Sequence, residues 1–137
     1  MGDTHFTGPV QSDGGFVGDV VGAVTGNQTG THYDAAAPTA YSGATGQKAI
    51  SPAVSVGSLT KATAGTDYTL AAPGAGNINK FITVYSTTAA AHVVTVTGLL
   101  GGTTLTFAAA IGGSFTLYAV SPTAWAVVAL TGVTQSA

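Results

Sequence analysis

Short apolar runs separated by glycine-rich turns fill the second half of this 137-residue sequence, and this pattern strongly limits the available folds. The runs are rich in β-branched and aromatic residues, which favour strands, and polar residues alternate with apolar ones along them. Glycines stand between the runs at spacings typical of β-hairpins. The runs that we interpret as strands are 80–87, 92–97, 103–107, 114–120 and 124–130.

The alternation within these runs also predicts which side chains form the core. Segments 54–59 and 67–70, with a turn at 64–66, can add two further strands. Alanine runs 89–91 and 108–110 are too short for stable helices, so we expect them in turns. The sequence therefore predicts an all-β fold, an antiparallel β-sandwich, barrel or jelly-roll-like module. The predicted inward residues are Phe81 or Ile82, Val94, Val96, Leu105, Phe107, Phe115, Leu117, Trp125 and Val127.

The N-terminal stretch is built differently, because a glycine recurs at every fourth position from Gly14 to Gly30. The repeated units GFVG, DVVG, AVTG and NQTG disfavour a helix, since each glycine costs about 1 kcal/mol relative to alanine. Repeated short units need neighbours to cover their apolar side chains. We therefore divide the chain into an extended Gly-rich arm, 1–47, and a β module, 48–137; the alternative is that the arm is a flexible tail. The residues expected to anchor the arm to a partner are Phe6, Phe16, Val17, Val20, Val21 and Val24.

Charged residues make up only 6% of the chain, with a net charge of −2 and neither Glu nor Arg. Three scattered lysines cannot neutralise a run of phosphates, so nucleic acid is not an expected partner. The sequence has no basic membrane anchor and no apolar run long enough to span a bilayer, which disfavours a membrane partner. The N-terminus lacks the features of a secretory signal, so we expect synthesis in a cytoplasm. The low charge instead suits a surface that is partly covered by other proteins.

Groups that could support catalysis are scarce, because the chain contains no Cys, five Asp and three His. The arm contains two close pairs, Asp3 with His5 and His32 with Asp34, but no metal-binding motif accompanies them. His92 is expected at the start of a strand, either exposed or hydrogen-bonded to a neighbour. We therefore expect no enzymatic activity, no cofactor and no metal; a small esterase or metal-dependent hydrolase is the least favoured alternative.

Two segments resemble known proteins: FTGPVQSDGGFVGDVVGAVTGNQTG in the arm and SPTAWAVVAL near the C-terminus. The arm resembles bacteriophage virion proteins with short Val-, Thr- and Gly-rich repeats. The Thr- and Ala-rich strands that end in a Trp strand resemble small head-decoration (cement) proteins and head-fibre modules. The resemblance implies a β-rich structural protein, often a homotrimer, that binds the major capsid protein on the outer surface of an assembled phage head and stabilises it.

A second hypothesis from the same resemblance is a tail-fibre or head-fibre module that binds host surface glycans. Aromatic rings stack on sugars, so this function requires exposed aromatic side chains. Those in strands are more simply interpreted as core or interface residues. The candidates are Tyr33, Tyr41, Tyr68, Tyr85, Tyr118 and Trp125.

Overall fold

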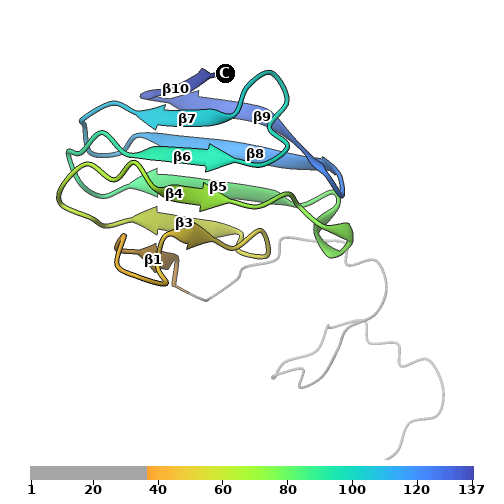
Figure 1. The fold of residues 1–137 in the computed structure, drawn as a ribbon, viewed down its shortest axis with the longest axis horizontal. Coiled ribbons are helices and arrows are strands. Elements are labelled where there is room, and N and C mark those ends of the chain that lie inside the picture. The colour runs from red at the N-terminus through yellow and green to blue at the C-terminus, as the bar shows by residue number, and fades with distance from the viewer. Residues whose placement is uncertain (1–36) are drawn as a thin grey trace, which may run out of the picture. The chain divides into compact units, whose positions relative to one another are not determined.

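Two five-stranded β-sheets pack face to face in the computed structural model, which describes residues 37–137 (Figure 1). The strands are β1 (Thr39–Tyr41), β2 (Ala49–Ile50), β3 (Val56–Leu59), β4 (Tyr68–Leu70), β5 (Phe81–Ser86), β6 (Val93–Val96), β7 (Thr104–Phe107), β8 (Ser114–Ser121), β9 (Ala124–Thr131) and β10 (Val133–Ser136). Sheet 1 has the order β1-β3-β5-β8-β9, and sheet 2 has the order β10-β7-β6-β4-β2. A single 3₁₀ turn, η1 (Ala75–Asn77), precedes β5.

Strands β1 to β6 alternate between the two sheets along the chain, so neighbours within each sheet run parallel. From β5 onward the chain also forms antiparallel pairs, namely β5 with β8, β8 with β9, β6 with β7 and β7 with β10. The predicted all-β sandwich is therefore confirmed. The expectation of wholly antiparallel pairing is wrong for β1 to β4, because each of them crosses to the opposite sheet before the next strand begins.

The β module also includes residues that the sequence analysis assigned to the arm. Strand β1 pairs with β3, and Tyr41 at its end is buried. The Tyr41 hydroxyl accepts a hydrogen bond from the Ser51 N–H (3.1 Å), and its carbonyl accepts one from the Tyr68 hydroxyl (3.1 Å). Residues 39–47 thus belong structurally with 48–137.

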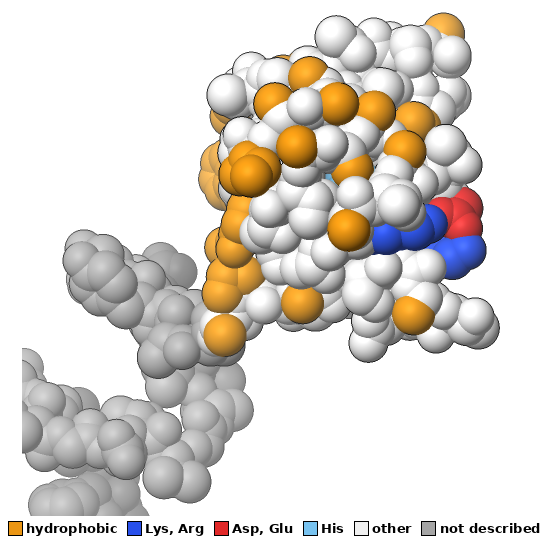
Figure 2. Space-filling view, turned by 90° about the vertical axis from the view of Figure 1, so that its left-hand side faces the viewer, with side chains coloured by type: hydrophobic (Ala, Val, Ile, Leu, Met, Phe, Trp, Pro, Cys, Tyr) orange, Lys and Arg blue, Asp and Glu red, His pale blue; other side chains and the backbone are white. Residues whose placement is uncertain are grey.

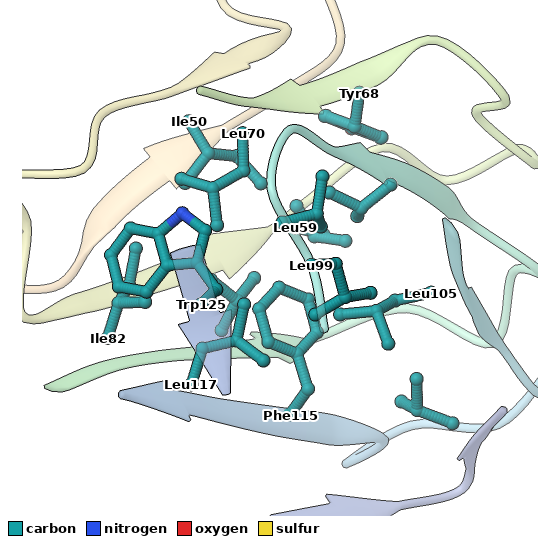
Figure 3. Packing of buried hydrophobic residues seen from close by; sticks show 14 of the residues in the cluster. Ile50, Leu59, Tyr68, Leu70, Ile82, Leu99, Leu105, Phe115, Leu117 and Trp125 are labelled. Carbon is teal, nitrogen blue, oxygen red and sulfur yellow. The ribbon is translucent and has the colours of Figure 1, made fainter. Parts of the chain in front are cut away.

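One hydrophobic core fills the space between the sheets, and it contains almost all of the predicted inward residues. Ile82 is fully buried whereas Phe81 is 55% exposed, so Ile82 is the inward member of that pair. Val127 is only half-buried and packs against the core from the edge strand β9. Figure 3 shows side chains from both sheets gathered around Trp125, whose indole N–H donates to the Ala71 carbonyl (2.9 Å).

A close backbone approach connects the β6–β7 turn to the edge strand β9. The Trp125 N–H donates to the Gly98 carbonyl and the Leu100 N–H donates to the Trp125 carbonyl, both at 2.9 Å. Gly98 has φ +80°, and a Cβ at this position would stand 2.0 Å from the Thr123 carbonyl oxygen. Only glycine fits this turn without a shift of the backbone.

Candidate interaction surface

The outer face of sheet 1 is built mainly from a stretch of sequence without charge. Lys80 is the last Asp, Glu, Lys or Arg in the chain, so residues 81–137 carry none. This stretch supplies β5, β8 and β9, three of the five strands of sheet 1. Their outward side chains, with one from β3, form what we call the sheet 1 face: Val56, Phe81, Thr83, Tyr85, Ser114, Thr116, Tyr118, Val120, Ala126, Val128, Ala129 and Thr131.

An aromatic pair lies on this face. Phe81 and Tyr118 are cross-strand partners whose ring centroids are 4.9 Å apart with an interplanar angle of 43°. The Tyr118 hydroxyl donates to Asn79 Oδ1 (2.8 Å), which fixes the orientation of the ring. In the next outward-facing pair, the hydroxyls of Thr83 and Thr116 are hydrogen-bonded at 3.0 Å. These contacts orient the side chains before any partner binds, which reduces the conformational entropy that they lose on binding.

The edges of the two sheets are poor sites for adding another strand. Of the four edge strands, β1, β2 and β10 have only three, two and four residues. The longer edge strand β9 has a register shift opposite Thr116 and Leu117, and its main chain at Trp125 is already bonded to Gly98 and Leu100. Short and bulged edges disfavour strand pairing between molecules. The faces are therefore the better candidates for contact with a partner.

The outer face of sheet 2, which we call the sheet 2 face, has a different chemistry. Threonine and serine side chains follow one another across neighbouring strands, and the hydroxyls of Thr104 and Ser136 are hydrogen-bonded at 2.7 Å. The only ion pair of the described residues, Lys48 with Asp67, lies beside this sheet. Among the side chains that Figure 2 shows, the charged ones lie together at one profile, and apolar side chains follow the opposite profile. The outward hydroxyl-bearing residues are Thr69, Thr95, Thr104, Thr106, Thr134 and Ser136.

A buried histidine ties together the loops at one end of the sandwich. The Gly65 N–H donates to His92 Nδ1 (3.2 Å), and His92 Nε2 lies 3.1 Å from Thr88 Oγ1. Because the Thr88 hydroxyl donates to the Lys61 carbonyl (2.7 Å), Nε2 must carry the proton and donate to Thr88. Burial, and secondarily the nearby Lys61 charge, lower the pKa of His92. The ring is therefore held neutral, and the prediction that His92 is hydrogen-bonded to a neighbour is confirmed.

The predicted site residues fall into two groups, those outside the described residues and those within 37–137. The six arm anchors, Phe6, Phe16, Val17, Val20, Val21 and Val24, lie outside the described residues, as do Tyr33 and both Asp–His pairs of the arm. Among the aromatic candidates for sugar stacking, Tyr41, Tyr68 and Trp125 are buried, whereas Tyr85 and Tyr118 are half-buried.

Phe81 is the surface residue that sequence reasoning did not assign. It shares its face with Thr83 and Tyr85, whereas Ile82 and Val84 alternate with them toward the core. The alternation in the sequence could have placed Phe81 on the outer face, because the strand face that includes Thr83 is more polar than the one that includes Ile82 and Val84.

Within 37–137, we find no group of three metal-ligating side chains and no helix that could cross a membrane. No protein-family model, curated protein or solved structure matches this chain. Its function must therefore be argued from the surfaces themselves.

Proposed function

We propose that this protein is a viral structural protein, a decoration (cement) protein that binds the outer surface of an assembled phage head and stabilises it. The observation that carries the proposal is the sheet 1 face, which exposes Phe81, Val56 and Val128 without any charged residue among its members. Such a face loses little hydration energy when another protein covers it, because no charge has to be desolvated. Its chemistry suits contact with protein rather than with a charged polymer.

The stabilising mechanism is mass action. A protein that binds the assembled head, and not the free capsid subunits, lowers the free energy of the assembled state by its own binding free energy. Many weak contacts repeated by the symmetry of the head add together. In this proposal the arm contacts the major capsid protein through the anchors named above, and the β module associates with other copies.

The test compares assembled heads that lack the protein with unassembled capsid subunits. We expect the full chain to co-sediment with heads and not to bind free subunits, and the decorated heads to release their DNA at a higher temperature. A variant with Val20→Asp and Val21→Asp should bind heads much more weakly, because each charge would have to be buried in the contact. Equal binding to heads and to free subunits, or no binding to either, would exclude decoration.

Glycan binding by a fibre module is the second candidate, and one observation favours it. Phe81 and Tyr118 form an accessible aromatic pair beside the polar side chain of Asn79, and such pairs can stack on sugar rings. A glycan array separates the two functions. Binding to particular sugars that is lost in Phe81→Ala, without any binding to heads, would replace decoration by glycan recognition.

A further inference from the structure

We propose that the sheet 1 face is covered by another copy of this chain. A contact between identical molecules brings like charges together wherever charged residues lie near a symmetry axis, and this repulsion costs free energy. None of the residues of the sheet 1 face is charged. The nearest charge in sequence, Lys80, donates its Nζ to Asn77 Oδ1 (3.1 Å) in the 3₁₀ turn before β5. The face is therefore electrostatically compatible with itself.

The size of the face also fits an interface between copies. Five strands spaced about 4.8 Å apart give a width of about 19 Å, and the eight residues of β8 extend about 27 Å. The flat area is therefore about 500 Å², and projecting side chains add to it. A standard protein interface covers about 800 Å² on each partner, so this face is of the right order for a stable contact.

The arrangement of side chains resembles that of an interface core. The aromatic pair of Phe81 and Tyr118 supplies the large rigid rings that dominate binding energy in such contacts. Val56, Val120 and Val128 are all at least 39% exposed around it. The hydroxyls of Thr83 and Thr116 already bond to each other, which lowers the cost of removing them from water.

The sheet 2 face provides a matched control within the same molecule. It is also an exposed outer sheet surface, but its described outward residues are mainly Thr and Ser, without an aromatic pair. Hydroxyl groups remain well hydrated without a partner, so this face gains less by being covered. A substitution at the exposed Thr95 introduces the same charge into the opposite sheet.

The experiment measures the mass of the full chain in solution by light scattering after size exclusion, over a range of concentrations. We expect the measured mass of the unmodified protein to be at least twice the 13.3 kDa of one chain. Phe81→Asp and Val128→Asp should each raise the concentration needed for association by more than about tenfold, whereas Thr95→Asp should leave it unchanged. Circular dichroism and thermal unfolding of each variant verify that the sandwich remains folded.

A monomeric unmodified protein, or association that survives both Phe81→Asp and Val128→Asp, would overturn the inference. If Thr95→Asp alone abolishes association, the contact lies on the sheet 2 face instead and the inference also fails. The inference deepens the proposed function, but mass is measured without phage heads. A protein that associates through this face yet does not bind heads would therefore contradict decoration alone.

Discussion

The N-terminal and C-terminal regions of the sandwich, residues 37–80 and 81–137, are built on different principles. The N-terminal region contains β1 to β4, strands of two to four residues that make only parallel pairs. The C-terminal region contains β5 to β10, and every pair within it is antiparallel. All charged residues that the structure describes lie in the N-terminal region. The comparison indicates that the C-terminal region is the scaffold and that the N-terminal region extends each of its sheets.

The largest expected effect is at Trp125, a fully buried residue of the scaffold that also bonds to Ala71 in the N-terminal region. Trp125→Ala leaves a large cavity and an unpaired carbonyl, so we expect a loss of about 3–5 kcal/mol in the free energy of unfolding. Urea unfolding monitored by circular dichroism measures this. Val127→Ala, at a half-buried site on the same strand, should cost less. Equal losses at both positions would show that Trp125 does not hold the two regions together.

A second prediction concerns two glycines of the scaffold that share a positive φ. A Cβ added at Gly98 (φ +80°) would stand 2.0 Å from the Thr123 carbonyl oxygen, whereas a Cβ added at Gly112 (φ +86°) would have no neighbouring atom within 4 Å. Gly112→Ala should lower the free energy of unfolding only by the strain of an alanine in the left-handed conformation, about 1–2 kcal/mol. Gly98→Ala must also displace the backbone, which adds about 1–3 kcal/mol. The difference in unfolding free energy between the two variants measures the cost of the close approach of residue 98 to the Thr123 carbonyl. Similar values for both variants would contradict this cost.

The third prediction tests the junction between the regions, because His92 and Thr88 of the scaffold hold Gly65 and Lys61 of the N-terminal region. The pKa of His92 is lowered in the folded protein, so the unfolded chain takes up its proton first as pH falls. The stability from neutral His92 is therefore complete above about pH 6.5, the ordinary histidine value, and is lost as pH falls below it. Tyr68 and Phe107, the rings beside His92, stay uncharged over this range.

Urea unfolding at pH values from 7.5 to 5 measures this dependence. In His92→Gln the side-chain amide can retain both hydrogen bonds without taking up a proton. We expect the variant to lose less stability than the unmodified protein over the same range. Parallel curves for the two proteins would show that His92 does not cause the acid sensitivity.

The smallest effect should come from the ion pair between Lys48 and Asp67 in the N-terminal region. Their side chains are 40% and 43% exposed, so solvent screens the attraction. Lys48→Ala and Asp67→Asn should each cost less than about 1 kcal/mol, and the cost should shrink further at high salt. A double-mutant cycle at two salt concentrations measures the coupling. A coupling as large as the Trp125 effect would contradict the assignment of the scaffold to the C-terminal region.

The sequence predicted the C-terminal region well, because information about its strands is local. Runs such as 114–120 show clear alternation, and in the two hairpins, β6–β7 and β8–β9, the partner strand follows within a short distance along the chain. The hairpins expected between 80–87 and 92–97 and between 103–107 and 114–120 are wrong, because β5 pairs with β8 and β7 pairs with β10. The parallel pairs of the N-terminal region could not be predicted in this way. Strand β3 pairs with β5 only after the chain has crossed to sheet 2 and returned, and nothing in the local pattern records that crossing.

Other elements were missed because their side chains carry little signal. Strands β1 and β2 have three and two residues, fewer than a periodicity requires, and β10 (VTQS) is largely polar. The exposed aromatic of the candidate surface was left ambiguous because Phe81 and Ile82 are adjacent and both apolar. The arm anchors remain predictions.

The alternation of β1 to β6 between the sheets also has a consequence for the rate of folding. The C-terminal end of β4 cannot be enclosed by sequence-local contacts alone, because Trp125 of β9, more than fifty residues later, donates to the Ala71 carbonyl next to it. Folds dominated by such distant contacts close slowly, on timescales of milliseconds to seconds. During synthesis, the early strands must wait until nearly the whole chain has left the ribosome, and their apolar side chains stay exposed to other chains in the meantime.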